Sequence, residues 1–221
     1  MRSLRTVIAC ATLVALPLAA HAGDSVSYTD TVAFQPFGAI PDFRVASFDA
    51  SMGQLESIEV SVDILWKGEI VIENTSPLES ATLLPHSRLE YELSVQWPDA
   101  SPIATFTGAF NPDALTLDPF DGVSDFDGDS GATLTQQRAF TASTTLNTES
   151  MAAFIDAGEQ LFAFSAVQVA LLSAQGGDVT LTSRAFAGGS LTITYNYVPT
   201  PGTLALIGVA PLALRRRRSR P

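Results

Sequence analysis

Apolar residues recur at every second position over most of this 221-residue chain, and that spacing constrains the fold more than any other feature. Ile58, Val60, Val62 and Ile64 alternate with polar residues, and residues 89–97 repeat the pattern. A period of two places apolar side chains on one face of a strand, whereas a helix needs a period of 3.6. The sequence therefore predicts strands that each bury one face.

Similar alternation extends along the chain between residues 26 and 197. The expected strands cover residues 26–34, 58–66, 70–72, 89–97, 103–109, 132–146, 160–172, 178–186 and 190–197. Only one segment predicts a helix, residues 148–157, with Thr148 as N-cap and Gly158 beyond its end. Many short alternating strands indicate an all-β fold, a single antiparallel β-sandwich domain over residues 23–197 with one short helix.

Turn residues separate these strands. Lys67-Gly68 is expected to close a hairpin, and Gly188-Gly189 to divide the last two strands. Asn111-Pro112-Asp113 and Gly176-Gly177-Asp178 predict two further turns.

The predicted domain is strongly acidic. All 23 acidic residues lie in it, but only five of the 12 basic ones, which gives a formal charge of −18. Those five are Arg44, Lys67, Arg88, Arg138 and Arg184. A field of this sign repels nucleic acid and anionic lipid, so nucleic-acid binding is excluded.

The first 22 residues have the layout of a signal peptide. A basic segment, residues 1–5, precedes an apolar segment, Thr6 to Ala19, and Ala20-His21-Ala22 forms an A-x-A cleavage site. The mature chain is therefore expected to be exported and to begin at Gly23. The sole cysteine of the full sequence, Cys10, lies in the removed segment, so disulfides and thiol chemistry are excluded for the mature chain.

The last 24 residues, 198–221, have an equally distinct order. Val198-Pro199-Thr200-Pro201 leads into an apolar run, Thr203 to Leu214. As a helix this run would measure about 18 Å, against a hydrocarbon core of roughly 30 Å. Four arginines end it: Arg215, Arg216, Arg217 and Arg218. Such charges stay on the cytoplasmic side, so the tail predicts a transient inner-membrane anchor with the domain facing outward.

This order of proline motif, apolar run and basic stop resembles the PEP-CTERM sorting signal, although Thr200 stands where that family usually has Glu. The resemblance implies processing by an exosortase-type sorting protease. It also implies delivery to the cell surface or extracellular matrix, in a setting of exopolysaccharide and other surface proteins.

The domain itself resembles the choice-of-anchor E family. Residues 48–55 (FDASMGQL) are similar to its opening motif, and Ile72-Glu73-Asn74 to its "VEN" segment. Residues 120–131 are similar to its Gly/Ser loop, and Leu191 to Tyr197 to its closing strand. The resemblance implies an extracellular domain and carries no activity.

The loop Asp118–Gly131 is the densest chemical feature. Asp125, Asp127 and Asp129 have the i, i+2, i+4 spacing of a Ca²⁺ loop. However, Ser130 replaces the expected glycine and Gln136 the expected bidentate glutamate. The alternative is that these aspartates are solvated turn formers.

Three further patterns bear on enzymatic or binding functions. Gly128-Asp129-Ser130-Gly131 matches the tetrapeptide of chymotrypsin-like proteases, with His86 and Asp99 in the required order but without the usual flanking residues. The many acids leave a carboxylate pair for glycoside hydrolysis open. Trp66 and Trp97 end apolar stripes, where they either close the core or stack on sugars.

These observations favour a non-enzymatic surface or matrix protein with no cofactor. The alternative is a Ca²⁺-dependent carbohydrate-binding module that uses Asp125, Asp127 and Asp129.

Overall fold

The computed structural model describes residues 23–146 and 151–200, and they form antiparallel sheets throughout. One four-stranded sheet has the order β1-β11-β3-β8, formed by Asp24–Pro36, Val179–Pro199, Gly53–Asn74 and Gly131–Leu146. The other has the order β2-β9-β5-β6, formed by Phe43–Ala46, Glu159–Leu171, Arg88–Gln96 and Pro102–Phe110. A three-stranded sheet has the order β10-β4-β7, formed by Ala174–Gln175, Ala81–Leu83 and Leu115–Leu117. The all-β antiparallel prediction is therefore confirmed.

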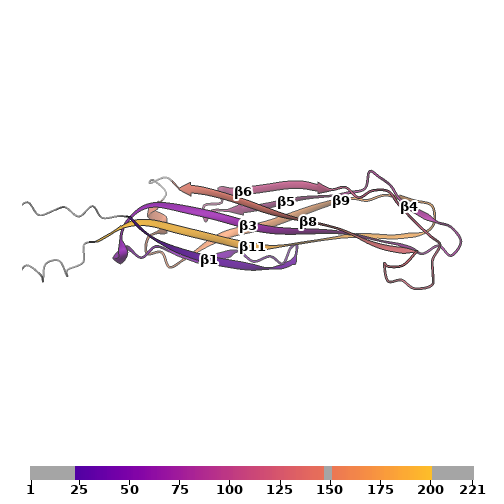
Figure 1. Ribbon diagram of the computed structural model, residues 1–221, viewed down its shortest axis with the longest axis horizontal. Helices are drawn as coiled ribbons and strands as arrows, with labels where there is room; N and C mark the ends of the chain where they lie inside the picture. Colours follow the sequence, from indigo (N-terminus) through magenta and orange to yellow (C-terminus); the bar gives the residue numbers. More distant parts are fainter. Residues whose placement is uncertain (1–22, 147–150, 201–221) are drawn as a thin grey trace, which may run out of the picture.

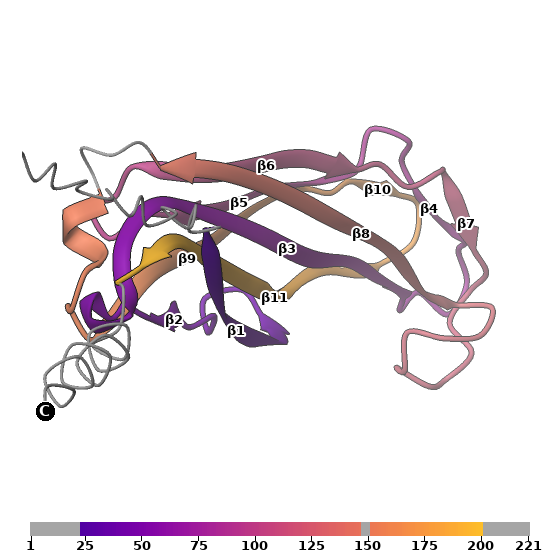
Figure 2. The same ribbon diagram turned by 60° about the vertical axis from the view of Figure 1, so that its left-hand side comes forward.

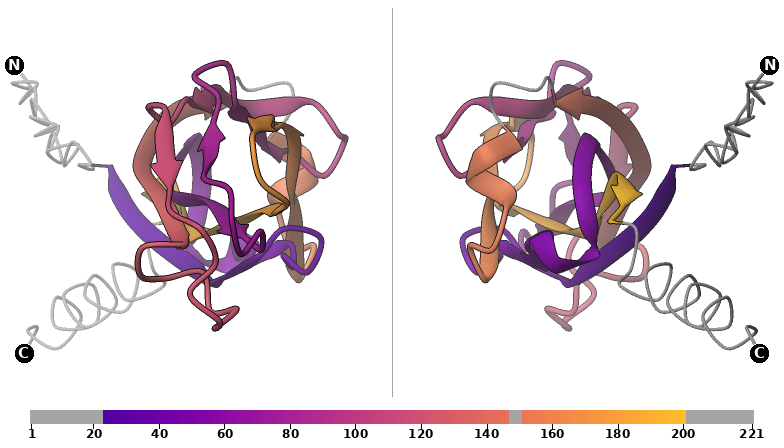
Figure 3. Two further views of the ribbon diagram at one scale, coloured as in Figure 1. Left: turned by 90° about the vertical axis from the view of Figure 1, so that its right-hand side faces the viewer. Right: turned by 90° about the vertical axis from the view of Figure 1, so that its left-hand side faces the viewer.

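The two larger sheets share one core. Ile58, Val60, Val62 and Ile64 of β3 are buried, and they belong to the same apolar cluster as Leu89 and its alternate neighbours in β5. In the views along the long axis, the strands enclose a single interior (Figure 3). The alternating apolar residues thus give each strand one buried face, as in a β-sandwich.

The molecule is long and narrow (Figures 1 and 2). The 22 residues of β3 extend over about 70 Å at the usual rise per residue. Its first residue pairs with Pro199, and Asp24 pairs with Tyr197, so both ends of the described chain emerge at one pole. The three-stranded sheet and the loop before β8 lie at the opposite pole.

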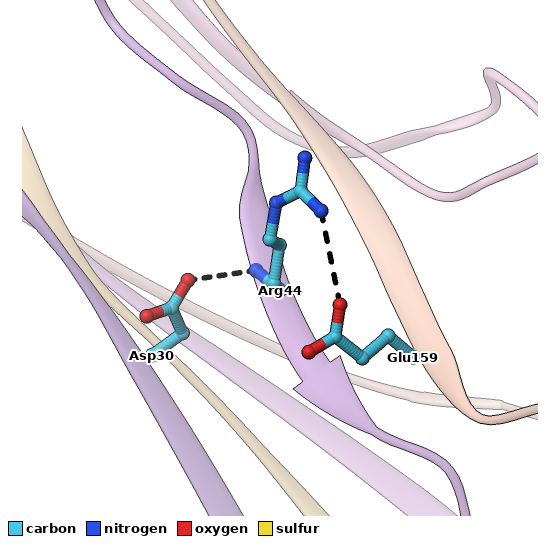
Figure 4. A network of polar contacts seen from close by, with 3 residues as sticks. All are labelled: Asp30, Arg44 and Glu159. Atoms are coloured by element: carbon cyan, nitrogen blue, oxygen red, sulfur yellow. Dashed lines mark hydrogen bonds and ion pairs between the residues drawn. The ribbon is translucent and has the colours of Figure 1, made fainter.

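Near the first pole, β1 and β2 connect the two larger sheets at one side (Figure 4). The Asp30 carboxylate accepts a hydrogen bond from the Arg44 amide at 2.7 Å. The Arg44 guanidinium lies 3.7 Å from Glu159 at the start of β9. Both of these ion-pair side chains are largely exposed, so the pair adds little to stability.

The predicted hairpin at Lys67-Gly68 is wrong, because β3 continues through both residues. Trp66 and Gly68 lie on the same face of the strand, and a β-carbon on Gly68 would lie 2.6 Å from the Trp66 indole and 2.9 Å from Leu89. Gly68 therefore makes room for the indole and does not form a turn.

The turn predicted at Gly188-Gly189 is wrong for a similar reason. Both glycines lie within β11, which pairs with β3 without a break there. A β-carbon on Gly188 would lie 2.7 Å from the Phe34 backbone, and one on Gly189 would overlap the carbonyl oxygen of Asp63. These glycines allow close approach of neighbouring strands.

The helix predicted over residues 148–157 is shorter than expected. A 3₁₀ turn covers Met151–Phe154, and its buried residues are Met151 and Phe154. The proposed N-cap, Thr148, lies outside the described residues. A second 3₁₀ turn, Ala50–Met52, starts at Asp49, whose side chain accepts from the Ser51 amide.

The remaining strand predictions are confirmed to within a few residues. β6, β8 and β9 match the ranges 103–109, 132–146 and 160–172. The turns predicted at residues 111–113 and 176–178 lie between strands, as expected. Residues 23–146 and 151–200 contain no helix that is long and apolar enough to cross a bilayer.

Candidate functional site at the acidic pole

The acidic loop Asp118–Ser130 connects β7 to β8 at the pole opposite the chain ends (Figure 2). All five of its aspartates are exposed: Asp118, Asp121, Asp125, Asp127 and Asp129. A backbone hydrogen bond ties its two ends together, since the Asp118 amide donates to the Asp129 carbonyl at 2.9 Å. The loop is therefore a closed projection that carries five of the domain's 23 acidic residues.

A buried carboxylate holds this loop to the sheet. Glu73, near the end of β3, is fully buried, and its Oε2 accepts from the Phe126 amide at 2.6 Å. Its Oε1 accepts from the Ser130 hydroxyl at 2.8 Å. Phe126 has φ of 61°, a conformation that non-glycine residues rarely adopt, and the bond to Glu73 offsets its cost.

Asn74, the next residue, also forms hydrogen bonds to loops at this pole. Its side-chain amide donates to the carbonyls of Glu79 and Asp118, both at 2.7 Å. Its Oδ1 accepts from the Ser76 amide at 3.1 Å. Glu73 and Asn74 thus position two loops, residues 75–80 and 118–130, from the end of one strand. The sequence pattern alone did not predict this role.

Two of the candidate calcium ligands are engaged within the loop itself. Asp125 Oδ1 accepts from the Asp127 amide at 3.1 Å, and Asp127 Oδ1 accepts from the Gly128 amide at 2.9 Å. Such bonds are typical of aspartate in turns. In the described part of the chain, no three acidic, histidine or cysteine side chains are arranged to hold a metal ion. Calcium binding by Asp125, Asp127 and Asp129 stays a prediction.

The protease pattern is not assembled. Ser130 is fully buried and donates its hydroxyl to Glu73, so it is no exposed nucleophile. Asp99 lies in the turn between β5 and β6, at the pole of the chain ends. The Ser101 hydroxyl and amide donate to this carboxylate and lower its pKa. His86, the candidate base, is exposed in the loop between β4 and β5.

Both tryptophans belong to the core. Trp66 is fully buried and Trp97 is 9% exposed, which confirms the interpretation that they close the core. Trp97 lines one hollow of about 460 Å³ with Asp99, Phe154 and Gln160, at the pole of the chain ends. Neither indole presents a free face for stacking on a sugar.

Some residues of the predicted processing signals lie in the described part of the chain, and the others lie outside it. Val198 and Pro199 are the last residues of β11 and pair with Gln54 and Gly53. The other sorting and cleavage residues lie outside the described residues: Ala20, Ala22, Pro201, Arg215, Arg216, Arg217 and Arg218. The proline motif thus begins inside the folded domain.

No protein-family model matches the sequence, and no curated protein matches it. Among solved structures, the chain is similar to one of infectious bursal disease virus, Gx strain, at 11% identity and a TM-score of 0.21. That match covers 81% of this chain and 37% of the other. A VP2 subviral particle of the same virus gives 11% identity and a TM-score of 0.22, over 80% and 38% of the two chains. The chain thus spans well under half of these proteins, and TM-scores this low carry no argument about function.

Proposed function

We propose that this chain is an exported, non-enzymatic protein of the cell surface or extracellular matrix. Its tail acts as a transient inner-membrane anchor that an exosortase-type protease processes. The β-domain then associates with exopolysaccharide or with other surface proteins. The tail motif and the N-terminal leader are the basis of the sorting part of this proposal.

One structural observation carries the proposal furthest. Both ends of the described chain lie at one pole of an elongated domain, and the acidic loop lies at the other. Only Thr200 to Gly202 separate β11 from the apolar run that begins at Thr203. A domain attached in this way extends away from the membrane and presents its acidic pole outward.

The charge of the domain fits an extracellular, hydrated setting. A formal charge of −18 keeps copies soluble and apart from anionic lipid. Association with an anionic polysaccharide would then depend on shared cations, whereas a neutral polysaccharide would bind without them.

The sorting step is tested in a Gram-negative host with and without its exosortase. The wild-type chain is expected outside the inner membrane, shortened at its C-terminal end, only in the host that has the enzyme. Intact-mass spectrometry and immunoblots of the cell fractions report both properties. Pro201→Ala is expected to keep the tail and remain in the membrane, whereas Pro41→Ala, at an exposed loop proline, behaves as wild type. The same full-length mass in both hosts would overturn the proposal.

The association step is tested on the released protein. We expect it to sediment with exopolysaccharide purified from the host, and we expect no release of reducing sugar during prolonged incubation. Release of sugar would instead make the domain a glycoside hydrolase.

A further inference from the structure

One edge of β9 has no neighbouring strand over most of its length. β5 pairs with residues 163–171 on one side, but β2 covers only residues 159–162 on the other. The Asp42 carboxylate accepts from the Phe164 amide at 3.3 Å and marks the end of the covered part. Backbone groups alternate in direction along a strand, so those of Ala166, Gln168 and Ala170 also face the open edge.

Apart from Ser165, the outward face of this strand is apolar from Leu161 to Leu171. Leu161, Val167, Val169 and Leu171 are 44%, 57%, 50% and 46% exposed. No charged residue occurs from Gln160 to Gly177. Natural sheet edges are usually protected by lysine, proline or inward-pointing charge, and this edge has none of the three.

The composition of the edge itself indicates what can pair with it. A strand that adds here lies beside an uncharged segment, Gln160 to Gly177, and must match its exposed apolar side chains. The same segment of a second copy meets this requirement. We infer that β9 pairs with β9 of a second copy of this chain, antiparallel and about a two-fold axis at Gln168.

The register follows from which backbone groups are free. An axis at Gln168 places Ala166 of one copy opposite Ala170 of the other, so that three residue pairs exchange backbone hydrogen bonds. On the outward face it places Val167 opposite Val169 of the second copy. An isologous contact of this kind closes after two copies.

Gln168 supplies an independent observation. Its side chain faces inward, and its Oε1 is buried without a hydrogen-bond partner among the described residues. An unpaired buried acceptor is costly. The two-fold register brings the Gln168 amide of the second copy directly opposite, where the two amides satisfy each other. The observations that support this pairing involve neither the leader nor the tail.

Sedimentation velocity of the full chain, over a range of concentrations and at one low detergent concentration, tests the pairing. Wild type is expected to form a dimer. Val167→Glu with Val169→Glu is expected to weaken dimerisation at least tenfold, because each added carboxylate would face its counterpart and also lie beside Glu92 or Glu90 of β5. Val123→Glu is the matched control, since Val123 is 55% exposed on another surface, and this variant should dimerise as wild type. A wild-type monomer at every concentration, growth beyond two copies, or equal loss in the control would overturn the inference.

Cysteine cross-linking tests the register in a Cys10→Ala background, where no other cysteine is present. Under mild oxidation Gln168→Cys is expected to give a disulfide-linked dimer, because opposed residues have the Cα separation that a disulfide needs. Ala166→Cys is expected to stay unlinked, since its two copies lie four residues apart along the paired strands. Linkage through Ala166→Cys alone, or of Gln168→Cys to a different protein from the host, would overturn the two-fold pairing.

Discussion

The indole of Trp66 lies against the phenol ring of Tyr91, with ring centroids 4.0 Å apart and 27° between their planes. Trp66 belongs to β3 and Tyr91 to β5, so this stack joins the two larger sheets near the middle of the domain.

Trp66→Ala is expected to destabilise the domain by about 3–5 kcal/mol, because it removes the largest fully buried side chain. Trp66→Phe should cost clearly less, since it keeps part of the stack and removes an indole N–H that has no partner among the described residues. Urea unfolding monitored by circular dichroism gives both values. Equal losses for the two variants would contradict this account.

Gly189→Ala is expected to destabilise the domain by about 2 kcal/mol or more. The new methyl group would overlap the carbonyl oxygen of Asp63, and a backbone atom in the central strand pairing cannot move away cheaply. Gly23→Ala is the control, because the nearest atom to its methyl group would be Glu56 Oε2 at 3.6 Å. Thermal unfolding compares the two variants, and a similar midpoint for both would show that the strands can separate.

Glu73→Ala is expected to release the acidic loop from the sheet. It leaves the Phe126 amide and the Ser130 hydroxyl without their acceptor, at a cost of about 1–3 kcal/mol. Hydrogen exchange should then speed up over residues 118–131 before the rest of the domain. Glu92→Ala, at an exposed position of β5, should leave that exchange unchanged.

Calcium is expected to leave the effect of Asp127→Ala unchanged. In the loop, Asp127 accepts from the Gly128 amide, so its loss should lower the melting temperature by the same amount in EDTA and in millimolar CaCl₂. A calcium-dependent rise of several degrees in wild type that disappears in Asp127→Ala would instead make the loop a metal site.

Alkaline pH is expected to destabilise the domain from about pH 10 upward. Burial raises the pKa of Tyr195, whose hydroxyl donates to the Ala46 carbonyl at 2.9 Å. The stabilisation is complete below the unfolded-state value of about 10 and is lost as the pH rises toward the folded-state value. Tyr195→Phe should therefore reduce the slope of unfolding free energy against pH above 10. Urea unfolding at several pH values measures that slope, and an unchanged slope would assign it to other groups.

Alternation of apolar and polar residues predicted the longer strands and their buried faces. It missed the four short strands β2, β4, β7 and β10, which have two to four residues and are too short to show a period. Gly68, Gly188 and Gly189 were misread as turns because a glycine that permits close approach looks the same in sequence as a glycine that turns. What distinguishes them is the neighbour across the sheet, such as Phe34 or Asp63, and that neighbour is distant in the chain.

The acidic pole was predictable only in part. The spacing of Asp125, Asp127 and Asp129 drew attention to the correct loop, but its anchor lies more than 50 residues earlier, at Glu73. The one local signal for that anchor is a glutamate next to Ile72, where a strand's alternation gives way to continuous burial. A carboxylate there has to find buried donors, which only the folded chain supplies.

The common exit of both chain ends at one pole has a geometric consequence for assembly. Antiparallel pairing along β9 turns the two copies end for end, so their tethered poles would point in opposite directions. Neighbours standing upright on the same surface could not adopt that arrangement. Two copies anchored on facing surfaces could pair in this way, and the dimer would then bridge the two surfaces. Two copies that had both been released could also pair.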